Sequence, residues 1–181
     1  MRLQILNAIV LLIFVFSCEG VDTNGNESKS EGGSDLNSTA KLYEDIKKTT
    51  DDNLRLSLYN KIIEIDPQDS YAYYGRAAIY KKLGQYDNAI QDFRLSIRVD
   101  DPNHPPTKQE IYCDRGDVNA ILGKHYNAIE DYSAAIAIDP KFSRAYQGRA
   151  DSYLKLGKHE EAARDQQTVK ALLSDTVLSK Q

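Results

Sequence analysis

The side chains of this 181-residue chain that could carry chemistry are three histidines, two cysteines and scattered carboxylates. His125 and His159 stand 34 residues apart, and Tyr86 occupies the matching place further upstream. A repeated position of this kind favours packing at the start of a helix over metal ligation, which needs several converging ligands. No glycine-rich phosphate loop, His-x3-His pair or Ser/His/Asp set with a supporting frame occurs. We therefore expect no enzyme, no cofactor, no catalytic or metal site and no small-molecule substrate.

The cysteines and the net charge exclude further classes of protein. Cys18 and Cys113 are too few for a disulfide-stapled scaffold. Cys113 is expected to be a small, partly buried hydrophobic residue. The formal charge of -4, about -5 without Arg2, gives no basic footprint for DNA or RNA, so we expect no nucleic-acid partner.

A pattern of residue types that recurs along the chain, which we call the frame, indicates which elements position these side chains. The central copy holds aromatic, arginine, glycine, alanine and proline residues at fixed intervals. These are Tyr112, Arg115, Gly116, Gly123, Ala128, Tyr132 and Pro140. Counterparts follow 34 residues later and also lie upstream. They are Tyr146, Arg149, Ala150, Gly157 and Ala162 downstream, and Tyr73, Arg76, Ala77, Gly84, Ala89 and Phe93 upstream. The frame is typical of stacked helix–turn–helix units, so the chain is predicted to be all-α, an α-solenoid of antiparallel helix pairs.

Four helix pairs are predicted, the first of them degenerate. Their approximate ranges are 38–67, 70–102, 107–140 and 142–174. Small residues at matching places on both helices allow close approach, while aromatic side chains fill the space between them. Thr107 and Glu110 form a capping box. An insertion around Pro105 and Pro106 stretches one repeat spacing to 39 residues; the 100–107 loop is either a tolerated surface insertion or a partner contact.

The frame also predicts three ion pairs within the helix pairs. Arg76, Arg115 and Arg149 each precede an aspartate by sixteen residues. The expected partners are Asp92, Asp131 and Asp165.

The ends of the chain have different compositions. Residues 1–17 read as a signal peptide, because a cation at Arg2 precedes an apolar run, 8–16, too short to span a bilayer. Residues 18–37 are polar and predicted to form a flexible tether, with a mean reach of about 25 Å. Residues 175–181 are expected to be a C-terminal tail.

Two resemblances to known families follow from these motifs. The frame of the central copy resembles the tetratricopeptide repeat, with three copies plus one degenerate N-terminal pair across about 37–174. Asn119, where an aromatic is usual, and the arginines in place of leucine depart from the pattern. The run Val15-Phe16-Ser17-Cys18 resembles the lipobox of bacterial lipoproteins, which implies cleavage before Cys18 and a diacylglycerol on its thiol. An ordinary secretory signal or an uncleaved anchor are the alternatives.

The repeat family implies a groove lined by the first helix of each pair. The groove candidates are Tyr71, Tyr74, Ala78, Lys81, Glu110, Cys113, Asp114, Asp117, Arg144, Gln147 and Asp151. They suggest an aromatic end, an acidic middle that favours a basic partner, and a mixed end. Family members that clamp a peptide carboxylate use Lys, Asn and Arg at places where this chain holds Tyr74, Ala78, Asp114 and Gly148, so such a clamp is not expected.

The two resemblances together imply a non-catalytic binding or scaffolding module for another envelope protein or peptide. A lipid would attach the module to a membrane. We expect this to be the outer membrane of a diderm bacterium, with the module on its periplasmic or surface face. The alternatives are an accessory subunit of an envelope enzyme or export complex, or a soluble secreted adaptor.

Overall fold

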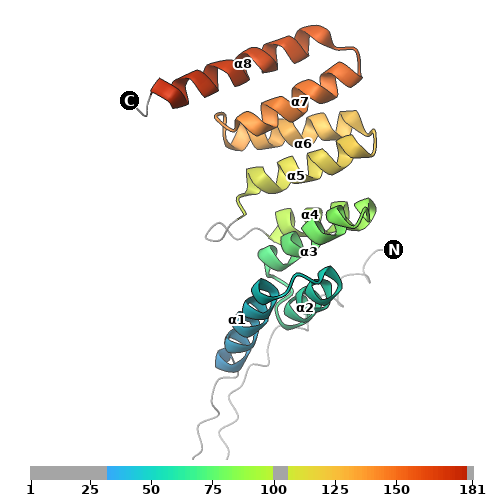
Figure 1. Ribbon diagram of the computed structural model, residues 1–181, viewed down its shortest axis with the longest axis vertical. Coiled ribbons are helices and arrows are strands. Elements are labelled where there is room, and N and C mark those ends of the chain that lie inside the picture. Colours follow the sequence, from blue (N-terminus) through green and yellow to red (C-terminus); the bar gives the residue numbers. More distant parts are fainter. Residues whose placement is uncertain (1–31, 100–105, 179–181) are drawn as a thin grey trace, which may run out of the picture. The chain divides into compact units, whose positions relative to one another are not determined.

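A computed structural model describes residues 32–99 and 106–178, with side chains from 38 to 99 and from 106 to 174. All regular elements in these ranges are helices, which confirms the predicted all-α repeat solenoid (Figure 1). They are α1 (Gly32–Lys48), α2 (Asp52–Ile65), α3 (Ser70–Lys82), α4 (Tyr86–Val99), α5 (Lys108–Ile121), α6 (His125–Ile138), α7 (Ser143–Lys155) and α8 (His159–Leu178). The predicted signal peptide, Cys18 and loop residues 100–105 lie outside the described residues.

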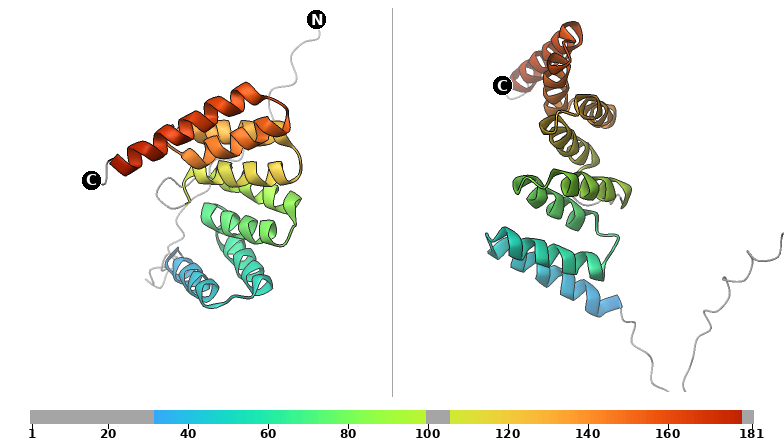
Figure 2. Two further views of the ribbon diagram at one scale, coloured as in Figure 1. Left: turned by 45° about the horizontal axis from the view of Figure 1, so that its top comes forward. Right: turned by 90° about the vertical axis from the view of Figure 1, so that its right-hand side faces the viewer.

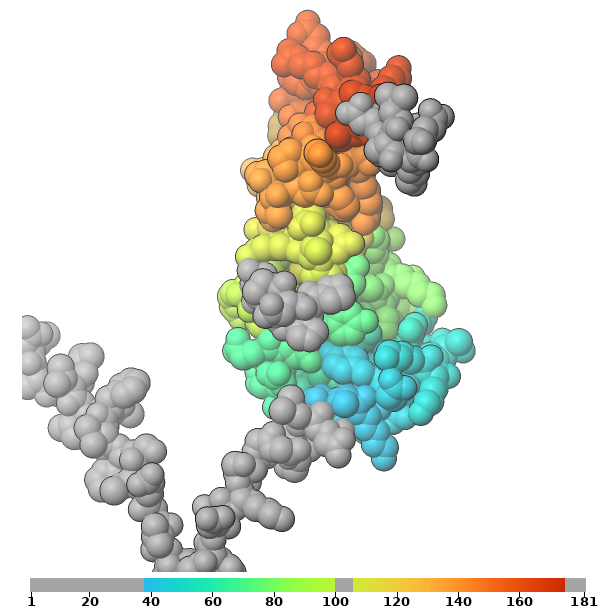
Figure 3. All heavy atoms as spheres, turned by 90° about the vertical axis from the view of Figure 1, so that its left-hand side faces the viewer, coloured from blue at the N-terminus to red at the C-terminus, as the bar shows by residue number. Residues whose placement is uncertain are grey.

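The helices follow one another as stacked hairpins. Contact is most extensive within the pairs α3–α4, α5–α6 and α7–α8, and the second helix of one pair then packs against the first helix of the next. The order is visible in Figure 2 and as successive coloured bands on the surface in Figure 3. Residues 34–181 form one compact unit.

Small residues explain why these three pairs pack so closely. Ala77 and Ala150 on first helices, and Ala89, Ala128 and Ala162 on second helices, are at most 1% exposed. The aromatic rings of Phe93 and Tyr132 fill the space left between the backbones and are almost fully buried. Each hydrophobic cluster joins one hairpin to the first helix of the next. Because all of these clusters lie within 34–181, this unit contains its own core.

Local signals fix the helix ends. Gly84, Gly123 and Gly157 have φ between 71° and 73°, the left-handed conformation that ends α3, α5 and α7 at little steric cost for glycine. At the start of α5, the Glu110 carboxylate accepts hydrogen bonds from the backbone N–H and the hydroxyl of Thr107, both at 2.8 Å. The predicted cap is therefore present just after the insertion.

The outer helices extend beyond their predicted limits. Helix α1 begins at Gly32, inside the segment predicted as tether, and α8 continues to Leu178, inside the predicted tail. The first and last repeats have a neighbouring repeat on one side only, which gives α1 and α8 little packing at their outer ends. They can still be long, because adding residues to an existing helix is far easier than nucleating a new one. Polar composition thus misplaced both boundaries. None of the described helices is both long and apolar enough to cross a bilayer.

Candidate interaction face

Three ion pairs with buried aspartates join the two helices in each of the pairs α3–α4, α5–α6 and α7–α8. The guanidinium of Arg76 donates to both Asp92 carboxylate oxygens at 2.7 and 2.8 Å, and Arg149 donates to Asp165 at 2.8 Å twice. Arg115 pairs with Asp131 in the same way, through Nε at 3.1 Å. The aspartates are only 5–7% exposed at their side chains. These contacts confirm the sixteen-residue prediction.

An aromatic ring lies beside each of these arginines. The guanidinium carbons of Arg76 and Arg115 lie 5.7 and 5.4 Å from the ring centroids of Tyr73 and Tyr112. The hydrogen bond to Asp92 raises the pKa of Arg76, outweighing the opposing effect of burial. Each arginine is thus held by charge on one side and by a ring on the other.

The first helices approach one another across repeats. Helix α5 contacts α7 directly, whereas the second helices in the described ranges make no comparable contact with each other. Side chains of α3 also reach α5. The first helices α3, α5 and α7 therefore line one face of the array. We define the first-helix face as the groove candidates on α3, α5 and α7.

Four charged residues form the centre of this face, and we call them the charge cluster: Lys81, Asp114, Asp117 and Arg144. Lys81 Nζ donates to Asp114 Oδ1 at 3.3 Å and to Asp117 Oδ2 at 3.4 Å. Arg144 donates to the same two oxygens at 2.7 and 2.5 Å. The cluster thus links α3, α5 and α7, across the joint that contains the insertion.

Two tyrosines complete the hydrogen bonding of the carboxylates. Tyr74 donates to Asp114 Oδ2 and Tyr132 donates to Asp117 Oδ1, both at 2.8 Å. Burial raises the pKa of both phenols, and the neighbouring carboxylate raises it further, so both stay protonated donors at neutral pH. Burial by itself would raise the pKa of Asp114. The hydrogen bond from Arg144 and the charge of Lys81 outweigh it, so that pKa is lowered.

The predicted acidic middle of the groove is therefore largely neutralised, and Glu110 is the carboxylate there that neither Lys81 nor Arg144 pairs with. Two carboxylates face two cations, and the four formal charges cancel. The sequence placed Asp114 and Asp117 on the correct face. It did not indicate that Arg144, 30 residues away, reaches back to them. The expected preference for a basic partner is weakened and stays a prediction.

The other groove candidates divide into exposed and enclosed residues. Tyr71 is 42% exposed, and Ala78, Gln147 and Asp151 are also exposed. Glu110 is half-buried and held in the helix cap.

Cys113 does not belong to the contact surface. Its side chain is fully buried in the cluster with Tyr132 and Ala145, so its assignment to the groove was wrong. Burial raises the pKa of its thiol to about 12. The turn of α5 that exposes one residue to the groove directs the neighbouring one into the core.

Sequence reasoning missed the part played by two glycines. A Cβ on Gly148 would lie 2.4 Å from Cζ of Tyr132, and one on Gly75 would lie 2.3 Å from Cζ of Tyr59. The missing side chains leave room for each ring to pass between helices, which lets the Tyr132 hydroxyl reach Asp117. In both cases the tyrosine precedes the glycine by sixteen residues, a signal visible in the sequence.

The histidines do not share one environment. His125 is half-buried at the start of α6, and its Nδ1 is enclosed without a hydrogen-bond partner. His159 is exposed at the start of α8. The packing role predicted for both therefore fits His125 alone. Within the described ranges, no group of three or more His, Cys, Asp or Glu residues could hold a metal ion.

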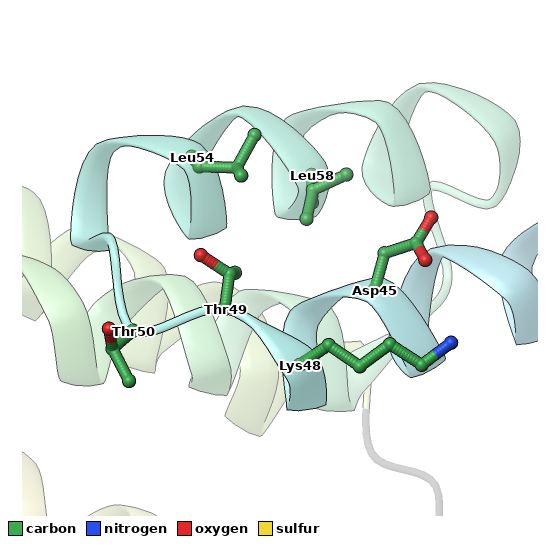
Figure 4. A pocket seen from close by; sticks show the side chains of 6 residues that line it. All are labelled: Asp45, Lys48, Thr49, Thr50, Leu54 and Leu58. Atoms are coloured by element: carbon green, nitrogen blue, oxygen red, sulfur yellow. The ribbon is translucent and has the colours of Figure 1, made fainter.

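A separate hollow lies between the end of α1 and the start of α2 (Figure 4). It shares no residue with the first-helix face. Its lining residues are Asp45, Lys48, Thr49, Thr50, Leu54 and Leu58.

The stacked hairpins, glycine turns and repeated ion pairs define a helical-repeat protein. The chain matches the tetratricopeptide repeat family twice, over residues 58–91 and over 116–157. It is a tetratricopeptide repeat protein, and such repeats mediate protein–protein interaction.

Known proteins share parts of this array. Human DnaJ homolog subfamily C member 7 is 38% identical over 88 residues, which cover 49% of this chain and 18% of that protein. Human tetratricopeptide repeat protein 28 is 33% identical over 92 residues, covering 48% of this chain and 4% of that protein. The match spans less than a fifth of either relative.

Solved structures support the fold. The crystal structure of MamA superposes with a TM-score of 0.71 at 24% identity, covering 80% of this chain and 84% of that one. The second repeat domain of Spaghetti (RPAP3), bound to the HSP90 peptide SRMEEVD, gives a TM-score of 0.52 at 28% identity, covering 58% and 93%.

Proposed function

We propose that this protein is a non-catalytic interaction module whose first-helix face binds a segment of another envelope protein. The observation that carries the proposal is the arrangement of that face. A pre-formed and internally neutralised charge cluster lies on the same face as exposed Tyr71, Ala78 and Gln147, which belong to no core cluster. The Spaghetti repeats that resemble this array bind a peptide, which supports a peptide-like partner here.

The partner's segment need not carry a particular net charge. A partner carboxylate would have to displace Asp114 or Asp117 from Arg144, and a partner lysine would have to displace Arg144 from them. Both exchanges break charge-assisted hydrogen bonds in a partly buried place. Contact with Tyr71, Ala78 and Gln147 leaves the cluster intact.

Blocking substitutions test the face. Ala78→Arg places a long side chain on it, and Gln91→Arg places the same side chain at an exposed position of α4. Co-purification from crosslinked membranes should lose the partner with Ala78→Arg and keep it with Gln91→Arg. Equal recovery with both variants would contradict binding at this face.

We further propose that a lipid on Cys18 anchors the module in the cell envelope. The motif Val15-Phe16-Ser17-Cys18 supports this, and several acyl chains would make attachment effectively permanent. Cys18→Ala should move the protein from the membrane to the soluble fraction. A Cys18→Ala protein that stays on the membrane would contradict lipidation, and a wild-type protein that is soluble would support a secreted adaptor.

A further inference from the structure

The three joints between helix pairs in the described ranges are not built alike. A joint is the place where the second helix of one pair packs against the first helix of the next, so the three are α2–α3, α4–α5 and α6–α7. At the outer two joints a ring lies against a glycine, Tyr59 over Gly75 and Tyr132 over Gly148. At α4–α5 the frame places Asp114 where the glycine stands, 39 residues after Gly75. A ring therefore cannot pass as close to the backbone there.

A second contact is shared by the same two joints. Arg76 Nη1 donates to Asn60 Oδ1 at 2.7 Å, and Arg149 Nη1 donates to Ser133 Oγ at 3.0 Å. Each acceptor lies on the second helix of the preceding pair, which ties that helix to the next pair. On α4 the corresponding place is occupied by Arg94. A guanidinium group has no acceptor atom, so this hydrogen bond cannot form between α4 and α5.

Apolar contact is what joins α4 directly to α5. Phe93 is fully buried in a cluster with Ile111 and Val118 of α5. Apolar attraction has no preferred direction, so this cluster keeps the helices together without fixing the angle between them. The ion pair of Lys124 with Asp87, at 3.8 Å, also crosses the joint, but both side chains are at least 50% exposed and such pairs contribute little.

The directional contacts across this joint come from α3 and lie on the first-helix face. Tyr74 and Lys81 donate to Asp114 at 2.8 and 3.3 Å, and Lys81 also donates to Asp117 at 3.4 Å. The Asp114 side chain is only 14% exposed, so solvent screens these contacts less than the exposed pair at Lys124. We call these three hydrogen bonds the latch.

We propose that the array bends at the α4–α5 joint and that the latch sets the angle. Residues 34–99 and 106–178 are then two stiffer halves, because the joint inside each half keeps its ring–glycine contact and its arginine hydrogen bond. Opening the latch changes the distance across the first-helix face between Ala78 on α3 and Gln147 on α7. The bend does not depend on the proposed partner, since all of its contacts are internal to the array.

Distances between spin labels in the full-length protein test the bend. Gln91, Glu130 and Arg164 are exposed and occupy matching places on α4, α6 and α8. Labels attached there through p-acetylphenylalanine leave both cysteines unmodified. The pair 91–130 spans the α4–α5 joint, and the pair 130–164 spans the α6–α7 joint as the matched control. Double electron–electron resonance gives the distribution of each distance.

Removal of the latch should loosen one joint alone. Tyr74→Phe combined with Lys81→Met keeps the ring and the side-chain stem but removes the three hydrogen bonds. This variant should broaden the 91–130 distribution and leave the 130–164 distribution unchanged, which also shows that the protein stays folded. Lys82→Met removes the charge of an exposed neighbouring lysine and should change neither distance. No broadening in the latch variant, or equal broadening of both distances, would overturn the proposal.

Arg94→Asn tests the same joint in the opposite direction. The substitution supplies on α4 the acceptor that Asn60 supplies on α2. Added to the latch variant, it should narrow the 91–130 distribution again, because Arg115 gains a partner on the preceding helix. A distribution that stays equally broad would overturn the role given to the missing arginine hydrogen bond.

Discussion

Arginine at the same place in three repeats has one structural task, which is to hold the second helix against the first. The guanidinium of each lies between a tyrosine ring and a buried aspartate. Removing the arginine or the aspartate of a pair leaves the other charge buried and unpaired. The two residues should therefore be coupled more strongly in their effect on stability than residues of a surface ion pair.

A double-mutant cycle on Arg115 and Asp131, measured by chemical denaturation, should give a coupling energy of about 1–3 kcal/mol. The exposed pair Lys47 and Glu44, at 2.9 Å, is the control and should show no measurable coupling because solvent screens it. Zero coupling for Arg115 and Asp131 would remove the proposed role.

Cys113 should be unreactive in the folded protein. Burial raises the pKa of its thiol to about 12, so hardly any thiolate is present at pH 8. In a Cys18→Ala background, iodoacetamide should modify Cys113 only after denaturant is added. Fast modification of the native protein would show that α5 opens or that the thiol is accessible.

At this scale the sequence predicts contacts inside a repeat better than contacts between repeats. Arg115 and Asp131 recur in register, so their pairing could be predicted. The neutralisation of Asp114 depends on Lys81 and Arg144, which come from other repeats and occupy different places in the frame. Periodicity alone does not connect such residues.

Among the elements, pairing of a large ring with a glycine determines how one hairpin meets the next. Tyr132 from α6 passes over Gly148 of α7, and Tyr59 from α2 passes over Gly75 of α3. Between α4 and α5, where the insertion lies, the ring in the corresponding position is that of Phe93, which has no hydroxyl group. The Tyr74 hydroxyl binds Asp114 there instead.

Gly148→Ala should destabilise the array by about 1–3 kcal/mol through overpacking, because its Cβ would overlap the Tyr132 ring. Thermal or urea unfolding measures the effect. In a Tyr132→Leu background the added cost should largely disappear, since the ring that collides is gone. An equal cost in both backgrounds would place the strain elsewhere.

Helix existence was more predictable than helix limits. Glycine turns and the Thr107–Glu110 cap gave clear ends to the inner helices, and the structure has them. The start of α1 and the end of α8 carry no such signal, and their boundaries were misplaced.

For the molecule as a whole, the charge cluster is the contact that spans three repeats on one face. Lys81, Asp114, Asp117 and Arg144 link α3, α5 and α7. The cluster should therefore help to set the curvature of the face that a partner meets.

Acid should weaken this link. The pKa of Asp114 is lower in the folded protein than in the unfolded chain. Its contribution to stability is therefore complete above about pH 4 and is lost as the pH falls through the folded value. Asp114→Asn should be less stable than wild type at pH 7 but lose less stability between pH 5 and pH 3. An identical pH dependence in both proteins, measured by urea unfolding, would contradict this role.

The central claim, that the first-helix face binds a protein partner, is tested most directly by site-specific photocrosslinking in the cells that make the protein. A photoreactive residue at Ala78 or Gln147 should give a discrete adduct, and the same residue at exposed Gln91 or Arg94 of α4 should not. Adducts of equal yield from both sets of positions, or none from Ala78 and Gln147, would contradict the claim.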